Sequence, residues 1–307
     1  MTKLSDNPPC VVVAHDDGYA PHSAVTLLSV LDHTPNARLF ALVPSTFRQG
    51  DAMKDTVGPA LTLIRVDESR FATLKGWAGG SLATYLRLSM GDVLPIPRVI
   101  YLDADLVVRT DLTPLWSVDL GDNIIAAVPD VAFADRARLG LAADKPYFNS
   151  GVAVIDLDRW RSQAVGDRVV TWARENPDRL TWADQCAQNW VLRGQWLALD
   201  PMWNMQAPQF GHETKWGFRF DRRQSGDPAV VHFTAPPAHG RYADSEGKPW
   251  AYLCQHPWRD AYRRIAARTP WAGTPMPDRY PHNMALRLLR QHADWALPGY
   301  RALRRMI

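Results

Sequence analysis

Two aspartates separated by one residue carry the clearest chemical signal in the sequence. The stretch RVIYLDADLVVRT, residues 98–110, reads as an apolar strand that ends in Asp103, Ala104 and Asp105. Side chains two positions apart in an extended chain point the same way, so both carboxylates are expected to face one site. Converging carboxylates repel each other unless a cation lies near them. A divalent metal that also binds phosphate oxygens is the simplest occupant, and a pair of solvated turn residues is the alternative.

A histidine at the end of another predicted strand supplies a third ligand. The apolar run over residues 229–233 places His232 there. An imidazole beside two carboxylates favours Mn²⁺ over Mg²⁺ or Ca²⁺ and leaves coordination positions for diphosphate oxygens. We therefore predict a site of Asp103, Asp105 and His232 that holds Mn²⁺, with Mg²⁺ as the second candidate. A structural role is the alternative for a single histidine.

The segment after the first predicted strand suits a nucleotide. The strand over residues 10–14 is followed by Asp16, Asp17, Gly18 and Tyr19. A carboxylate accepts hydrogen bonds from a pyrimidine N–H or a ribose hydroxyl, and a tyrosine ring stacks on a base. Asp-Asp-Gly is also a common turn, which is the competing interpretation. The absence of a GxGxxG motif argues against a dinucleotide site.

Predicted strands and helices alternate along the chain. Further strands are expected over residues 39–43, 61–66, 99–102, 124–128, 152–155 and 196–199. Helices are expected over residues 22–31, 82–91, 158–175 and 182–193, with another between the strands at 39–43 and 61–66. This rhythm predicts an α/β fold with a mainly parallel sheet and helices on both faces. Ligands of such sheets bind beyond the carboxyl ends of the strands, where the acidic segments lie.

Composition and charge exclude several classes of function. The 307 residues include 35 Lys plus Arg and 32 Asp plus Glu, and a net charge of +3 is too balanced for a general nucleic-acid binder. The three cysteines lie far apart without a zinc-binding spacing, which suits a reducing compartment. The first residues lack a secretory signal, and no apolar run approaches the length of a membrane span. We therefore expect a cytoplasmic protein.

The end of the chain differs from the rest. We expect a catalytic domain over residues 1–255 and a small helical region over residues 256–307. From Arg279 to Ile307 there are six arginines against one acid, Asp294, interleaved with aromatic and aliphatic residues. This pattern predicts peripheral contact with an anionic membrane surface, at the inner face of the cell membrane. A packed C-terminal helix with a solvated face is the alternative.

These segments together resemble glycosyltransferase family 8, the retaining nucleotide-sugar transferases, and most closely the bacterial lipopolysaccharide galactosyl- and glucosyltransferases. The resemblance runs in order over roughly residues 10–250. The motifs that carry it are Ala14-x-Asp16-x-x-Tyr19, Tyr85-x-Arg87-Leu88, Tyr101-Leu-Asp103-x-Asp105 with DLTPLW after it, Phe148-Asn149-x-Gly-Val, Arg159-Trp160, Asp184-Gln185-Cys186, His232-Phe233 and Lys248-Pro249-Trp250.

The resemblance implies a fold, a metal and a role for each matching residue. It implies a GT-A-type fold, a Rossmann-like mixed sheet flanked by helices, in which Mn²⁺ on Asp103, Asp105 and His232 bridges the donor diphosphate. The residues implied for the nucleotide are Ala14, Asp16, Tyr19, Asp103, Ala104 and Lys248. The residues implied for the donor sugar are Arg87, Asp130, Asn149, Asp184 and Gln185. Gln185, by the anomeric carbon, and the neighbouring Asp184 are the implied catalytic residues.

The resemblance also implies the reaction. A hexose, galactose or glucose, passes with retention from a UDP-hexose to a glycan or lipid-linked saccharide, such as lipopolysaccharide core or another cell-surface saccharide. The chain departs from the family where Cys186 replaces an aspartate and where Ala235 replaces a glycine. It also lacks the phosphate-binding lysine soon after His232, and Lys248, by its Lys-Pro-Trp context, or Arg241, by its position, is expected to supply that charge. A sugar nucleotidyltransferase is one alternative, although AHDDGYAPHS lacks its glycine-rich basic loop. A metal-dependent hydrolase and a non-catalytic sugar-binding protein are the others.

Overall fold

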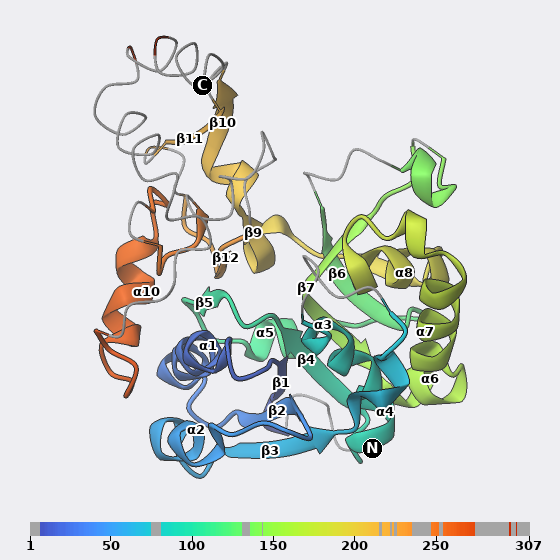
Figure 1. Ribbon diagram of the computed structural model, residues 1–307, viewed down its shortest axis with the longest axis horizontal. Helices are drawn as coiled ribbons and strands as arrows, with labels where there is room; N and C mark the ends of the chain where they lie inside the picture. The colour runs from blue at the N-terminus through green and yellow to red at the C-terminus, as the bar shows by residue number, and fades with distance from the viewer. Residues whose placement is uncertain are drawn as a thin grey trace. The chain divides into compact units, whose positions relative to one another are not determined.

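The computed structural model describes the chain in two compact units (Figure 1). The described residues are 7–74, 81–130, 136–142, 144–214, 217–221, 223, 226–234, 247–251, 254–273, 295 and 299. The first unit comprises Met1–Met205, Asp227–His232 and Ile265–Ala272, and the second comprises Gln206–Gly226, Phe233–Arg264 and Gly273–Ile307. Most of the predicted membrane-contacting region lies outside the described residues. The division into domains at residue 255 stays a prediction.

A seven-stranded mixed sheet forms the centre of the first unit, in the order β3-β2-β1-β4-β7-β6-β8 (Figure 1). The strands are β1 (Cys10–Ala14), β2 (Arg38–Pro44), β3 (Leu61–Val66), β4 (Arg98–Leu102), β6 (Ile125–Pro129), β7 (Phe148–Asp156) and β8 (Trp196–Ala198). Strand β7 runs antiparallel to both of its neighbours, β4 and β6, and the other pairings are parallel. The central strands are buried, as their continuous apolar runs predict. The predicted α/β fold with a mixed sheet is confirmed.

Helices flank this sheet and differ in detail from the predicted ones. They are α1 (Ala20–His33), α2 (Gly50–Val57), α3 (Ala83–Leu86), α4 (Met90–Val93), α5 (Thr113–Trp116), α6 (Leu157–Ser162), α7 (Val165–Glu175) and α8 (Ala183–Val191). The single helix expected over residues 158–175 is broken at Ala164, whose φ of 48° is left-handed. Just after the break, a Cβ on Gly166 would lie 2.4 Å from the carbonyl oxygen of Leu88. The start of α7 therefore packs closely against that carbonyl.

Short elements complete the chain. The 3-10 helices are η2 (Glu68–Phe71), η3 (Arg87–Ser89), η4 (Ala137–Leu139), η5 (Pro177–Arg179), η6 (Pro201–Asn204) and η7 (Ala207–Phe210). The remaining strands and helix are β5 (Leu106–Val108), β9 (Met205–Gln206), β10 (Gly211–Thr214), β11 (Gly217–Phe220), β12 (Val230–His232) and α10 (Arg259–Ala266). In the second unit, β10 and β11 form an antiparallel hairpin. Within the described ranges, no helix has the length and apolar character that crossing a bilayer requires.

Candidate active site

The pairing of β5 with β12 brings the three predicted metal ligands together. These strands run antiparallel, and His232 lies opposite Leu106, the residue that follows Asp105. The imidazole Nε2 lies 3.3 Å from Oδ1 of Asp105 and 3.7 Å from Oδ2 of Asp103. One ligand atom from each residue lies within 4.8 Å of the others. The two carboxylates converge as predicted, although the segment between β4 and β5 is a bend and not extended chain.

A glycine of β7 forms the floor of this cluster. The backbone N–H of Asp103 donates to the carbonyl oxygen of Gly151 over 2.7 Å, which holds the two segments together. A Cβ added to Gly151 would lie 2.3 Å from Cε1 of His232 and 2.7 Å from Oδ2 of Asp103. Both distances are far below van der Waals contact, so the predicted metal ligands occupy the space that any side chain at this position needs. Two carboxylates and an imidazole around such a cradle fit Mn²⁺ chemically.

A buried arginine links the predicted metal ligands to the predicted sugar-binding residues. Arg87 of η3 donates from Nη2 to Oδ1 of Asp103 over 2.8 Å, and its Nε lies 3.1 Å from Oδ2 of Asp184. Its Nη1 donates to the carbonyl oxygen of Ser150, and its guanidinium lies 4.3 Å from the centre of the Tyr101 ring. Burial by itself lowers the pKa of Arg87, but the two carboxylates raise it above its ordinary value. The guanidinium is therefore a fixed positive charge.

Asp184 is enclosed at the start of α8. It is 2% exposed; its Oδ1 accepts a hydrogen bond from Thr84, and its Oδ2 accepts one from Nε2 of Gln188 over 2.7 Å. Burial raises the pKa of this carboxyl group, and the charge of Arg87 opposes that shift. Its described contacts therefore make it the partner that holds Arg87.

Gln185 and the other predicted sugar-binding residues form one hydrogen-bonded group. The Nε2 of Gln185 donates to Oδ2 of Asp130 over 3.0 Å and to the hydroxyl of Tyr147 over 3.2 Å. Its Oε1 accepts from the backbone N–H of Ser150 over 3.0 Å. Asn149 donates from Nδ2 to the same oxygen of Asp130 over 3.2 Å. The structure thus brings together Asp130, Asn149 and Gln185, which come from three separate segments.

Cys186, the departure from the family motif, supports this group. Its Sγ accepts from the backbone N–H of Trp182 over 3.2 Å and lies 3.3 Å from the hydroxyl of Tyr147, which contacts Gln185. Burial raises the pKa of the thiol, so it stays neutral at neutral pH. A neutral group therefore stands where the family motif has a carboxylate.

The predicted nucleotide-binding residues are less completely assembled. Ala14 ends β1, and the carboxylate of Asp16 accepts from the backbone N–H of Tyr19 over 3.1 Å and from the hydroxyl of Ser81 over 2.6 Å. Ala104 is buried in the bend between the two aspartates. In the second unit, Nζ of Lys248 donates to the carbonyl oxygen of Phe233 over 2.7 Å. The nucleotide-binding roles of these residues stay predictions.

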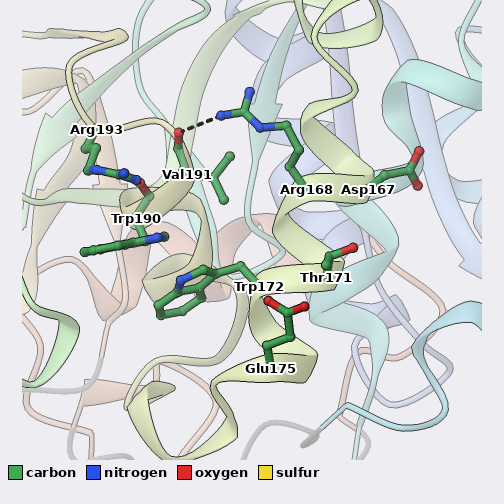
Figure 2. A pocket seen from close by; sticks show the side chains of 8 residues that line it. All are labelled: Asp167, Arg168, Thr171, Trp172, Glu175, Trp190, Val191 and Arg193. Atoms are coloured by element: carbon green, nitrogen blue, oxygen red, sulfur yellow. Dashed lines mark hydrogen bonds between the residues drawn. The ribbon is translucent and has the colours of Figure 1, made fainter.

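A pocket of about 370 Å³ lies between α7 and α8 (Figure 2). Trp172 and Trp190 stack there with ring centres 5.7 Å apart, and the guanidinium of Arg193 lies 4.1 Å from the Trp190 ring centre. None of the residues that line this pocket belongs to the predicted site.

Sequence reasoning missed several residues that support the site. Ser150 and Gly151 lie inside the Phe-Asn-x-Gly-Val motif, so that motif was a usable signal for them. Asn204 had no such signal, because its partners His232 and Asn149 lie 28 and 55 residues away. Tyr147 was likewise recognisable only by its contact with Gln185.

Comparison with known proteins gives a consistent result. General stress protein A of Bacillus subtilis is 29% identical over 278 residues, which cover 85% of this chain and 94% of that protein. Lipopolysaccharide glucosyltransferase WaaO of Escherichia coli is 25% identical, with 86% of this chain and 80% of WaaO covered. A structure of the galactosyltransferase LgtC in complex with donor and acceptor sugar analogues superposes with a TM-score of 0.70 and 25% identity, covering 90% of this chain and all of LgtC.

Other relatives are longer, and the chain spans between 30% and 56% of four glycosyltransferases of Streptococcus pneumoniae. The model of the family described as glycosyl transferase family 8 matches residues 10–254. With the mixed sheet and the acidic cluster in place, this match shows that the chain belongs to glycosyl transferase family 8.

Proposed function

We propose that this glycosyltransferase transfers galactose or glucose from a UDP-hexose to a glycan or lipid-linked saccharide, with retention of the anomeric configuration and with Mn²⁺ as cofactor. The observation that carries the proposal is the cluster of Asp103, Asp105 and His232, whose ligand atoms lie within 4.8 Å of one another. Arg87 contacts this cluster through Asp103, and both Arg87 and Gln185 form hydrogen bonds with Ser150. The proposed diphosphate site is therefore next to the proposed sugar site.

The metal ligands suit Mn²⁺, with Mg²⁺ as the weaker fit. When bound, the ion would supply Lewis-acid charge to the diphosphate leaving group, which then needs no proton. The protein would hold it through the two carboxylates and through Nε2 of His232. Gly151 keeps space for these side chains.

Arg87 orients the donor in this proposal. Its guanidinium is fixed by Asp103, Asp184 and the Ser150 carbonyl oxygen, so it loses little side-chain freedom when the donor binds. A preorganised positive charge beside the metal ligands attracts the phosphate and sugar oxygens of the donor. Asp130 and Asn149 extend this polar lining.

The contacts of Asp184 and Gln185 favour attack on the front face of the donor sugar. Asp184 is almost fully buried, and both of its oxygens accept hydrogen bonds within the protein. Gln185 is a neutral amide and a poor nucleophile, while its carbonyl oxygen accepts from Ser150. A covalent glycosyl intermediate therefore has no well-placed carboxylate among these residues. The departing phosphate oxygen is then the base for the acceptor hydroxyl.

The acceptor and the location of the protein belong to the same proposal. WaaO is named as a lipopolysaccharide glucosyltransferase and LgtC as a galactosyltransferase. Their names support a hexose donor and a saccharide acceptor of the cell surface. We further propose that residues 1–255 form the catalytic domain. We also propose that the protein is cytoplasmic and that its basic C-terminal region contacts the inner face of the membrane.

A panel of UDP-sugars, each tested with Mn²⁺ and with a chelator, tests the donor and the metal. Metal-dependent release of UDP with UDP-galactose or UDP-glucose supports the proposal, and nuclear magnetic resonance of the product reports the anomeric configuration. A rise in melting temperature with another nucleoside diphosphate but not with UDP overturns the donor assignment. Pyrophosphate formed from UTP and a sugar phosphate would point instead to a nucleotidyltransferase.

A further inference from the structure

We propose that Asn204 is a positioning residue for the metal site: it fixes the tautomer of His232 so that Nε2 offers its lone pair to the cation. The inference rests on the metal site of the proposed function. Asn204 ends η6 and is fully buried, so it acts through its neighbours and not by touching a substrate. Its amide lies 2.9 Å from Nδ1 of His232 on one side and 2.9 Å from the side chain of Asn149 on the other.

The backbone sets the orientation of these amides without ambiguity. The N–H of Gly151 lies 3.0 Å from a side-chain atom of Asn149, and a backbone N–H only donates. The atom that it meets is therefore the oxygen, Oδ1, of Asn149. The same oxygen lies 2.9 Å from Asn204, which must accordingly present its NH₂ group there.

The orientation of Asn204 then decides the protonation of the imidazole. Because the NH₂ group of Asn204 faces Asn149, its oxygen faces Nδ1 of His232. An amide oxygen only accepts, so Nδ1 carries the hydrogen. In the neutral imidazole the other nitrogen, Nε2, then bears the lone pair.

That lone pair points at negative charge. Nε2 lies 3.3 Å from Oδ1 of Asp105 and 3.7 Å from Oδ2 of Asp103. A lone pair and two carboxylate oxygens at these distances repel one another, and a divalent cation among them turns the repulsion into coordination. Asn204 therefore holds the imidazole in the form that binds metal and disfavours the opposite tautomer, which would donate to the carboxylates.

The same asparagine connects the metal ligands to the sugar-binding group. Asn149, its second partner, donates to Asp130, which also accepts from Gln185. Hydrogen bonds of this kind to a metal-bound imidazole orient the ring and raise metal affinity.

Nuclear magnetic resonance of the metal-free protein with ¹⁵N-labelled histidine tests the tautomer directly. The nine histidines give separate signals, and the His232→Gln variant identifies the one of interest. We expect a hydrogen on Nδ1 and none on Nε2 of His232 at a pH where this imidazole is neutral. A hydrogen on Nε2 together with none on Nδ1 in the wild-type protein overturns the inference whatever the variants do.

Calorimetric titration with MnCl₂ alone measures the effect on metal affinity. Asn204→Leu removes both hydrogen bonds and is expected to weaken Mn²⁺ binding by about 10–100-fold. Asn204→Asp keeps an acceptor for the Nδ1 hydrogen, so it is expected to retain both the tautomer and most of the affinity. The control is Asn123→Leu, which removes a side-chain hydrogen bond to the carbonyl oxygen of Leu120 in the turn before β6.

The outcomes separate this inference from the proposed function. If the wild-type protein binds no Mn²⁺, the proposed metal site fails. If it binds Mn²⁺ and the folded Asn204→Leu variant binds it equally well, the role of Asn204 fails while the metal site stands. Circular dichroism establishes folding, and if Asn204→Leu does not fold, the wild-type tautomer still decides.

Discussion

Replacing Gly151 with alanine is the sharpest single test of the site, because the substitution adds one methyl group at its centre. Gly151 lies within β7, and its φ is not in the left-handed region, so alanine is compatible with the backbone there. An alanine in a strand also loses less conformational entropy on folding than a glycine. Any harm done by this substitution must therefore come from the space that the methyl group takes.

The geometry sets the size of the effect. The added Cβ would lie 2.3 Å from Cε1 of His232, whereas carbon atoms in contact stay about 3.5–4.0 Å apart. One of the two groups must therefore move by about 1.2 Å or more. Metal sites tolerate ligand distances within about 0.2 Å of the preferred value, so the imidazole leaves the coordination sphere. Displacement of about 1 Å in an active site lowers activity on the order of 100-fold.

The effect on folding is expected to be much smaller than the effect on the metal. Overpacking by one methyl group costs about 1–3 kcal/mol of stability, which a domain of ordinary stability survives. The assay is therefore calorimetric titration with Mn²⁺ on protein whose fold is verified by circular dichroism. We expect Gly151→Ala to remain folded and to lose measurable Mn²⁺ binding together with UDP release.

Gly50→Ala is the matched control. Gly50 begins α2, and a Cβ there would lie 3.4 Å from the nearest atom, a side-chain carbon of Leu63. Alanine is expected to leave Mn²⁺ binding unchanged and to stabilise the helix slightly. If Gly151→Ala binds Mn²⁺ with wild-type affinity, then His232 and Asp103 do not lie against residue 151 when the ion is bound. The metal site described above would then be wrong.

Three further perturbations test a predicted metal ligand, the buried arginine and two buried histidines. Asp105→Asn removes one carboxylate ligand while keeping the shape of the side chain, and calorimetry and UDP release should show loss of Mn²⁺ binding and transfer with an unchanged melting temperature. Arg87→Met leaves two carboxylates without their buried partner, so urea unfolding should show a loss of about 3–5 kcal/mol, and a loss under 1 kcal/mol would contradict the ion pairs. Burial lowers the pKa of His15 to about 4 and that of His256 to about 3, below the ordinary 6.5, so below pH 6.5 the unfolded chain binds protons that the folded chain does not. Stability should be full above pH 6.5 and fall by up to about 1.4 kcal/mol per pH unit for each histidine toward pH 4, and thermal melts of His256→Phe should show a shallower fall.

Much of the fold follows from local sequence patterns. The strands expected over residues 10–14 and 61–66 agree with β1 and β3 at both ends. Strand β1 is buried and reads as a continuous apolar run, whereas β3 is partly exposed and contains Thr62 and Arg65 among its apolar residues. Strand β5 was not expected, because residues 98–110 contain no turn signal stronger than the Asp-Ala-Asp segment itself. Its separation from β4 is decided by pairing with β12, which is distant in sequence.

Some features of the candidate site could likewise be predicted from local sequence patterns, and others could not. Asp103 and Asp105 could be identified from the sequence alone, because two carboxylates this close together repel each other unless a cation lies near them. The contacts of Arg87 and Asn204 depend on partners from several segments, and no pattern of neighbouring residues encodes them. The break at Ala164 is likewise accompanied by a tertiary contact that neighbouring residues do not encode, the close approach of Gly166 to the carbonyl oxygen of Leu88.

The charges of the site predict the order in which the proposed metal and the proposed donor bind. When ionised, Asp103, Asp105 and Asp184 carry three negative charges, and Arg87 carries one positive charge that it shares between two of them. The cluster is therefore net negative by two, and a free diphosphate, itself negative, is repelled from it. A divalent cation cancels that excess and lets Arg87 and the metal attract the phosphate oxygens together. Under the proposed function, we therefore expect donor and metal to bind as a coupled pair, with the cation entering before or with the diphosphate.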